Sequence, residues 1–133
     1  MSKLACHCGN IISDSTYPSA TEGWIVRQQD QDALDELICQ SIAAFIAAIK
    51  AGKRDEWIRR LFHDPYPLDL DDASVISDII AFHKLGKALS ICECPQCGRL
   101  HVQKELGLNF YLGYMPIQEG YAAVLRSNSA PTS

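Results

Sequence analysis

The sequence predicts an α+β fold in which a helical segment of about three helices is inserted between the two halves of a small antiparallel β-sheet. Three observations predict it: cysteine pairs near both ends of the chain, helical periodicity between them, and period-two alternation after the helices. A chain of 133 residues fits one compact domain. We expect that domain to span residues 1–126 and a flexible C-terminal tail to cover residues 127–133.

The composition and charge exclude several classes of protein. Hydrophobic residues make up 47% of the chain and charged residues 21%, which is typical of a globular protein and not of a disordered one. With 12 basic and 16 acidic residues the net charge is −4, which argues against general binding to nucleic acid. No stretch has the roughly 20 apolar residues of a membrane helix, and the first residues carry no export signal. We therefore expect a cytoplasmic protein that binds no membrane and keeps its thiols reduced.

Five of the six cysteines lie in two short clusters, one near each end of the chain: Cys6, Cys8, Cys92, Cys94 and Cys97. Both clusters end in a Cys-Gly pair, completed by Gly9 and by Gly98. In a zinc knuckle, two thiolates of one tight turn bind the ion, backbone N–H groups point at sulfur, and glycine accepts the positive φ that follows. Two knuckles complete a tetrahedral site for a structural Zn²⁺, which we assign to the thiolates of Cys6, Cys8, Cys94 and Cys97.

Other sets of ligands remain open from the sequence. The first cluster has one residue between its cysteines, which is a weaker pattern than the Cys-x-x-Cys of the second cluster. His7, Cys92 or His101 could replace one of the assigned ligands. The alternative to a metal site is a group of buried free thiols, and we expect Cys39, which lies among apolar residues, to pack in that way.

The cysteine pattern predicts a protein that is not an enzyme. Four protein thiolates close the coordination sphere of zinc and leave no position for water or substrate. The zinc-deaminase signature and the His-Glu-x-x-His motif are both absent from the sequence. Cys94 and Cys97 could form a redox dithiol, but that chemistry favours a pair at the start of a helix, and here the strand-like residues 100–104 follow.

The residues between the two cysteine clusters predict three helices. Residues 32–51 place apolar side chains at i, i+3 and i+4, with Asp30 or Asp32 as the expected N-terminal cap. A shorter helix is expected over residues 54–63 and a third over residues 72–85.

Alternating apolar residues predict strands after the third helix. Residues 89–92 and 100–103 flank the second cysteine cluster, and residues 109–116 form a further strand rich in aromatic side chains. Ile11 and Ile12 are expected to form a strand that joins the same sheet. The expected product is a zinc-ribbon-like antiparallel sheet held together by the metal ion.

The cysteine motifs also resemble those of a poorly characterised family of small bacterial proteins. The resemblance covers roughly residues 6–16 and 92–115 and rests on three motifs: Cys6-x-Cys8-Gly9, Ile12-Ser13-Asp14-x-Thr16 and Cys94-Pro95-x-Cys97-Gly98-Arg99-Leu100. Similar proteins have a split zinc-ribbon frame with helices inserted between its halves, and some are immunity proteins of antibacterial toxin systems. The resemblance therefore implies a zinc-ribbon frame and a protein that neutralises a cognate toxin by occluding it.

We therefore expect a non-enzymatic, zinc-stabilised protein-binding module whose partner is a protein, most concretely a toxin. Acidic side chains before or within the first and third helices are the candidate contacts: Asp30, Asp32, Asp35, Glu36, Asp69, Asp71 and Asp72. The same carboxylates could instead cap helices or form solvated faces. The alternative function is a zinc-ribbon nucleic-acid-binding or regulatory protein, which is supported only by scattered basic residues: Arg54, Arg59, Arg60, Lys84, Lys87, Arg99 and Lys104.

Overall fold

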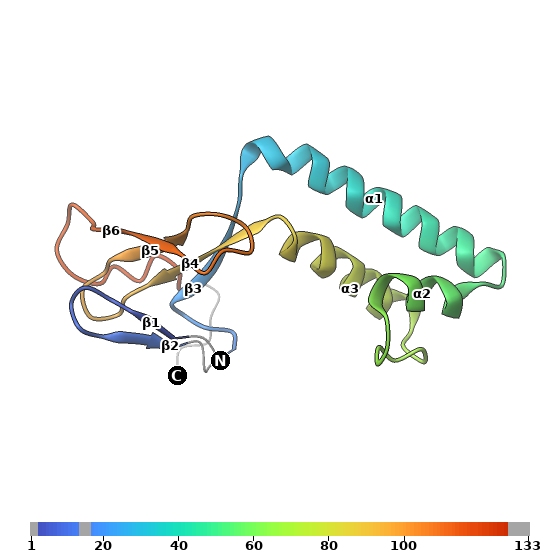
Figure 1. Ribbon diagram of the computed structural model, residues 1–133, viewed down its shortest axis with the longest axis horizontal. Helices are drawn as coiled ribbons and strands as arrows, with labels where there is room; N and C mark the ends of the chain where they lie inside the picture. The colour runs from blue at the N-terminus through green and yellow to red at the C-terminus, as the bar shows by residue number, and fades with distance from the viewer. Residues whose placement is uncertain (1–2, 14–16, 128–133) are drawn as a thin grey trace. The chain divides into compact units, whose positions relative to one another are not determined.

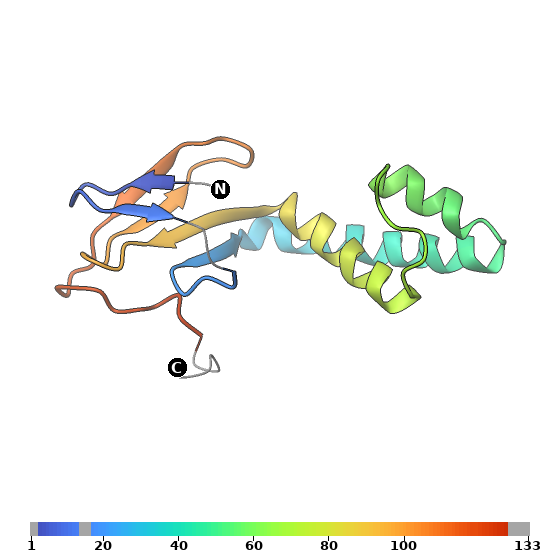
Figure 2. The same cartoon turned by 90° about the horizontal axis from the view of Figure 1, so that it is seen from below.

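The computed structural model describes residues 3–13 and 17–127 of the chain (Figures 1 and 2). Its contacts divide the chain into two compact units: Met1–Ile25 together with Ala88–Ser133, and Val26–Lys87. We call the first the sheet unit and the second the helical unit. The expected extent of the domain, residues 1–126, stays a prediction, and residues 128–133 of the expected tail lie outside the described residues.

The order of helices and strands confirms the predicted α+β fold class, with three helices between the early and the late strands (Figure 1). The elements of the described residues are β1 (Lys3–Ala5), β2 (Ile11–Ser13), β3 (Glu22–Val26), α1 (Gln28–Lys50), α2 (Arg54–Phe62), α3 (Asp72–Leu85), β4 (Ala88–Glu93), β5 (Leu100–Gln103) and β6 (Tyr111–Tyr114). Of the described residues, no helix combines the length and the apolar character that crossing a membrane requires.

The sheet unit contains two sheets, in which the pairs β1–β2, β4–β5 and β5–β6 are antiparallel. β1 and β2 form a two-stranded sheet in which Leu4 lies opposite Ile12. The other four strands form a second sheet in the order β3-β4-β5-β6. In this larger sheet Cys92 lies opposite His101, and His101 lies opposite Gly113, so these three residues share one face.

The strand β2 pairs with β1 because the first cysteine cluster forms a tight turn between them. The N–H of Cys6 donates to the C=O of Asn10 at 2.9 Å, and the N–H of Gly9 donates to the C=O of Cys6 at 3.0 Å. The turn folds the chain back on itself, which makes β1 the nearest partner of β2. Ile11 and Ile12 do lie in a strand, but the prediction that this strand joins the larger sheet is wrong.

Cysteine side chains contribute to the core of the sheet unit. The buried residues of this core are Cys6, Ile12, Cys92 and Cys94. Leu4 and Tyr111 are partly buried against them. The core therefore joins residues from the β1–β2 sheet to residues on β4 and β6 of the larger sheet.

The helical unit has a core of its own. Phe45 of α1, Ile58 of α2, and Val75 and Ile79 of α3 are fully buried in one cluster. Trp57 packs against Phe45 with ring centroids 5.2 Å apart. Apolar residues of the faces that the helical periodicity predicts therefore supply this core, but Leu37, Ile46 and Phe82 of the same faces are exposed.

The start of α1 differs from the prediction. The helix begins at Gln28, and its N-cap residue Arg27 makes no capping bond through its side chain. Asp30 lies inside the first turn, where its N–H donates to the C=O of Arg27 and its carboxylate lies 3.8 Å from the Arg27 guanidinium. The prediction that Asp30 or Asp32 caps the helix is therefore wrong.

Candidate metal centre

The four cysteines assigned as metal ligands lie together in the sheet unit. Their Sγ atoms are all within 4.8 Å of one another. Cys6 and Cys97 are 3.5 Å apart at sulfur, and Cys8 and Cys94 are 3.6 Å apart. Each close pair takes one sulfur from each end of the chain, so the four thiols could hold one metal ion between them.

Residues 6–9 form the first knuckle. Gly9 follows Cys8 with φ of 97°, a left-handed conformation that glycine adopts without strain. The N–H of Gly9 bonds to the C=O of Cys6, and the N–H of Cys8 bonds to the Cys6 sulfur. The positive φ and the sulfur-directed N–H predicted for a zinc knuckle are therefore confirmed in this turn.

Residues 94–98 form the second knuckle with the same features. Gly98 has φ of 79°, and its N–H donates to the C=O of Cys94 at 2.9 Å. The N–H groups of Gln96 and Cys97 both donate to the Cys94 sulfur. Because two backbone donors converge on one sulfur, the turn stabilises the thiolate form that binds metal.

Gly98 is further restricted by its neighbours. A Cβ atom at this position would lie 2.2 Å from the carbonyl oxygen of Gly120 and 3.3 Å from the Cα of Tyr121. Only a residue without a side chain allows this approach. The segment around Gly120 therefore lies directly against the second knuckle.

Two polar side chains also reach the sulfur cluster. Asn10 donates from Nδ2 to the Cys94 sulfur at 3.6 Å, and the Arg99 guanidinium donates to the Cys97 sulfur at 3.4 Å. Donors of this kind orient metal ligands and offset their negative charge. The sequence analysis did not predict that either residue contacts sulfur, although each directly follows a Cys-Gly pair, a shared position that could have indicated it.

The thiol pKa values follow from these contacts. The N–H of Arg99 is the main cause that lowers the pKa of Cys97 to about 6. Burial opposes ionisation of Cys94, but the bonds from Cys97 and Gln96 outweigh it and lower the pKa of that thiol. Burial raises the pKa of Cys6 to about 11. Two thiols are therefore predisposed to ionise, and a bound cation would stabilise the ionised form of Cys6.

The four cysteines differ in their burial. Cys94 and Cys6 are buried, Cys97 is half-buried and Cys8 is exposed. Four sulfur donors suit Zn²⁺ or iron and do not suit Mg²⁺ or Ca²⁺, which prefer oxygen. The donor set therefore fits a tetrahedral thiophilic metal held entirely by this chain.

The three alternative ligands lie outside this group of sulfurs. Among the described residues, the donor atoms that gather within 4.8 Å of one another belong to the four assigned cysteines. His7 is exposed in the first knuckle, and Cys92 is buried in β4 beside His101 of β5. Burial lowers the pKa of His101, with help from the charges of His7 and Arg99, and its Nε2 has no hydrogen-bond partner in the described part of the chain.

Cys39 is exposed on α1, so the prediction that it packs in the core is wrong. The core-facing side of α1 carries Leu34 and Phe45, both buried, and Ile38 and Ile42, both half-buried. Position 39 is rotated by about 100° from position 38 and points away from that side.

Of the four acidic candidates on α1, Asp30 is half-buried beside Arg27, and the other three are exposed. Asp32 is exposed. The carboxylate of Asp35 accepts from Gln31 at 2.9 Å, and that of Glu36 accepts from Gln40 at 3.0 Å. These are bonds between residues four apart on one helix, so the carboxylates remain accessible to a partner.

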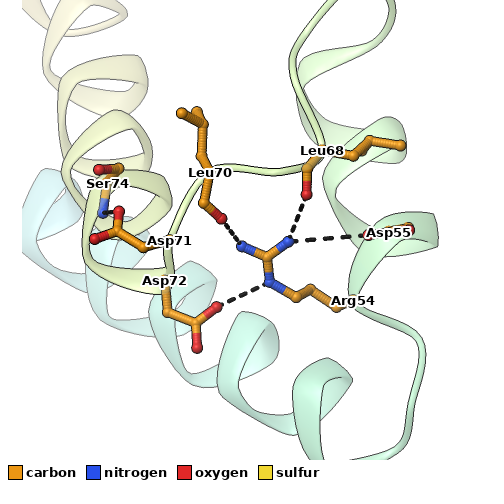
Figure 3. A network of polar contacts seen from close by, with 7 residues as sticks. All are labelled: Arg54, Asp55, Leu68, Leu70, Asp71, Asp72 and Ser74. Atoms are coloured by element: carbon orange, nitrogen blue, oxygen red, sulfur yellow. Dashed lines mark hydrogen bonds and ion pairs between the residues drawn. The ribbon is translucent and has the colours of Figure 1, made fainter.

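Two of the three acidic candidates near α3, Asp71 and Asp72, have structural contacts (Figure 3). Asp71 caps α3 by accepting a bond from the N–H of Ser74 at 3.0 Å. Asp72 accepts a bond from Nε of Arg54 at 2.8 Å. Asp69 is exposed. Capping, one of the alternatives considered for these carboxylates, is therefore confirmed for Asp71.

Arg54 connects the start of α2 to the segment that leads into α3 (Figure 3). Its guanidinium donates to the C=O of Leu68 at 2.9 Å and to the C=O of Leu70. It also lies over the ring of Phe45, 5.7 Å from the centroid. This basic side chain, a candidate for nucleic-acid binding, therefore serves the fold of the helical unit.

Comparison with known proteins places the chain in a family. Neither a curated protein nor a solved structure matches it. A family model described as a domain of unknown function, DUF8617, matches residues 2–118, which is most of the chain. The chain therefore belongs to the DUF8617 family.

Proposed function

We propose that this chain is a non-enzymatic protein-binding module stabilised by a structural zinc ion, and that it acts as an immunity protein that occludes a cognate bacterial toxin. The observation that carries the proposal is the group of four thiols within 4.8 Å of one another. A metal held by four protein thiolates has no open coordination position for a reaction. Reduced thiols suit the cytoplasm, so the proposal places the encounter with the toxin in that compartment.

Zinc would act by joining distant parts of the chain. The sulfurs of Cys8 and Cys94 belong to residues 86 positions apart, and those of Cys6 and Cys97 to residues 91 positions apart. A metal bound at all four removes conformational freedom from the unfolded chain, and its binding free energy adds to the free energy of folding. The ion would thus support the frame and leave the surface free for a partner.

The exposed carboxylates of α1 are the proposed steering surface. Asp32, Asp35 and Glu36 lie within two turns of the helix, and none of them contacts a basic side chain in the described structure. Asp71 and Asp72 have capping and ion-pair roles, so they contribute less to this surface. A basic protein would be attracted to α1 by opposite charge, which mainly raises the rate of association.

An apolar groove beside this surface could supply the buried part of the interface. It has a volume of about 500 Å³, and Leu37, Phe82 and Leu85 line it with exposed apolar atoms. Glu36 directly precedes Leu37 on α1. An apolar centre with a polar rim is the usual composition of a protein–protein interface, which supports a protein as the partner.

The alternative of nucleic-acid binding has less support from the basic residues. Arg54 contacts backbone carbonyls and Asp72, and Arg99 contacts the Cys97 sulfur. Lys104 lies over the ring of Phe110, 5.9 Å from its centroid. These three cations are engaged within the chain, which leaves fewer basic side chains to contact a phosphate backbone.

The experiment that tests the proposal is capture of the partner with tagged, metal-loaded protein from the source cells. The captured protein is then expressed alone and with this chain, and cell growth is measured. We expect the partner alone to stop growth and co-expression to restore it. A partner that is harmless when expressed alone would refute the immunity role, and capture of nucleic acid at physiological salt would move the function to the alternative.

A charge-reversal series tests the acidic surface. Asp32→Lys, Asp35→Lys and Glu36→Lys combined should slow association at least about tenfold at low salt and flatten its salt dependence. The matched control combines Glu56→Lys, Glu105→Lys and Glu119→Lys, which changes net charge equally at other exposed sites. Equal association rates for both triple variants would exclude α1 as the steering surface.

A further inference from the structure

The strand β6 forms one edge of the four-stranded sheet. The N–H of Lys104 donates to the C=O of Phe110 at 2.9 Å, which continues the register that pairs Val102 with Leu112. In an antiparallel pair, main-chain groups point alternately toward and away from the neighbouring strand. The N–H and C=O groups of Leu112 therefore point toward β5, and the N–H and C=O groups of Tyr111 and Gly113 point away from it. Among the described residues, no hydrogen bond reaches these outward groups.

The strand β6 and Phe110, the residue directly before it, expose a row of apolar side chains on one face of the sheet. Phe110, Leu112 and Tyr114 alternate with residues of the opposite face, and they are 51%, 39% and 55% exposed. Residues 109–115 include no charged residue and no proline. Soluble proteins usually protect a sheet edge with charged residues or proline, because an unprotected edge can pair with another strand.

We propose that β6 is an interface between two copies of this chain, which pair through their β6 strands in antiparallel orientation. The two-fold axis passes beside Leu112, so that Leu112 lies opposite Leu112 of the second copy. Tyr111 then lies opposite Gly113 of the second copy, and the two exchange both main-chain hydrogen bonds. The result is one continuous eight-stranded sheet across the dimer.

The side chains of β6 are self-complementary in this register. On the apolar face, Phe110 lies opposite Tyr114 of the second copy, and the reciprocal pair forms on the other side of Leu112. Aromatic pairs directly opposite each other are among the favourable cross-strand contacts. On the other face, Tyr111 lies beside Gly113, where a small residue leaves room for the ring.

Charge also favours a second copy at this edge. The chain has a net charge of −4, so copies repel each other over most approaches. The strand itself has no charge, and the proposed register places no two like charges opposite each other on it. Two cations lie beside this segment: Lys104 lies over the ring of Phe110, and Arg99 donates to the sulfur of Met115.

Disulfide trapping tests the register in the metal-loaded protein. Because Leu112 would form a non-hydrogen-bonded pair, its Cα should lie about 4.5 Å from its symmetry mate, within disulfide range. Leu112→Cys in a Cys39→Ser background should therefore form a covalent dimer under mild air oxidation. The control is Ile117→Cys in the same background, which is 97% exposed but lies beyond the strand. Equal dimer yields from both variants would overturn the register.

Sedimentation of the full chain tests the dimer itself. The wild type should sediment at twice the chain mass, and Leu112→Lys should weaken the dimer at least about tenfold because two lysines face each other at the axis. Ile117→Lys adds the same charge and should leave the dimer intact. Metal content and circular dichroism of each variant confirm folding. A wild type that stays monomeric at 0.1 mM, or a dimer that Leu112→Lys leaves unchanged, would overturn the proposal.

Discussion

The side-chain oxygen of Ser41 lies 2.7 Å from Nε2 of His83, which joins α1 to α3 through one hydrogen bond. The two residues are separated by 42 positions in the sequence, and the bond lies at a partly buried site within the helical unit. It supplements the apolar contacts of Phe45 and Ile79 with a polar contact of defined geometry.

Replacing Ser41 should measurably destabilise the helical unit. Ser41→Ala removes the bond and leaves Nε2 of His83 without its partner, which should lower the free energy of unfolding by about 1 kcal/mol. Urea unfolding followed by circular dichroism measures the change. The control Ser77→Ala removes an exposed hydroxyl of α3 and should cost less than about 0.5 kcal/mol. Equal losses would show that the bond contributes nothing.

Replacing Arg54 should lower the free energy of unfolding by more than replacing Ser41. Arg54→Met keeps much of the apolar stem over Phe45 but leaves the carbonyls of Leu68 and Leu70 and the carboxylate of Asp72 without their donor. We expect a loss of about 2 kcal/mol in unfolding free energy, because the bonds involve a charged donor. Arg60→Met, which removes an exposed i, i+4 ion pair with Glu56, should cost under about 0.5 kcal/mol and serves as the control.

The purified protein should contain one zinc ion per chain. Cys94→Ser combined with Cys97→Ser should abolish stoichiometric metal in elemental analysis and lower the melting temperature of the sheet unit, because a closed loop of the chain is released. Chelation of the wild type should lower it in the same way. Cys39→Ser, at the exposed cysteine of α1, should keep both metal and melting temperature. Iron in place of zinc, or no metal, would contradict the assignment.

The two knuckle glycines should differ in their tolerance of alanine. Gly9→Ala meets no atom within 4 Å and should cost only the strain of its positive φ, about 1 kcal/mol. Gly98→Ala has the same strain and also brings its Cβ to 2.2 Å from the Gly120 carbonyl oxygen, so backbone must move. The loss of stability should therefore be clearly larger at Gly98. Thermal unfolding of the two metal-loaded variants compares them directly, and equal losses would contradict this account.

Tyr66 should make stability depend on pH in the alkaline range. Burial raises the pKa of Tyr66 to about 12, helped by the bond that its hydroxyl donates to Asp78 at 2.5 Å. Since the folded state favours the neutral phenol, the stabilisation is complete below pH 10 and is lost as the pH rises toward 12. Tyr66→Phe lacks this titration, so the wild-type advantage in unfolding free energy should shrink over that interval. A constant difference would contradict the assignment.

The parts of the fold that depend on local pattern could be predicted from the sequence. The helices α2 and α3 were predicted to within one residue, because apolar periodicity and the flanking Pro65 and Gly86 act within single segments. The four cysteines could be grouped because Cys-Gly pairs have a mechanical reason to recur.

The parts of the fold and the site that depend on contacts between residues far apart in the sequence could not be predicted. The pattern of β3 is interrupted by Gly23, whose Cβ position would contact Ile91 and Leu125, so its role is defined only by tertiary packing. Likewise, Arg54 donates to the backbone carbonyls of Leu68 and Leu70. Every residue has such a carbonyl, so the sequence does not show which of them Arg54 will contact. The bonds from Asn10 and Arg99 to sulfur could not be predicted because the zinc-knuckle pattern specifies the cysteines and the glycine after them, but not the next residue.

In the sequence, one knuckle precedes the three helices and the other follows them, so the ribosome makes the two knuckles at different times. Cys8 leaves the ribosome 86 residues ahead of Cys94. The thiols of the first knuckle are therefore without those of the second knuckle while residues 26–87 are made. That intervening segment has its own core around Phe45 and Ile79 and can form while the chain is still being extended. A metal ion could therefore be bound by all four thiols only after the helical segment has been made, and a chain truncated before Cys97 would contain the helices but not the complete site.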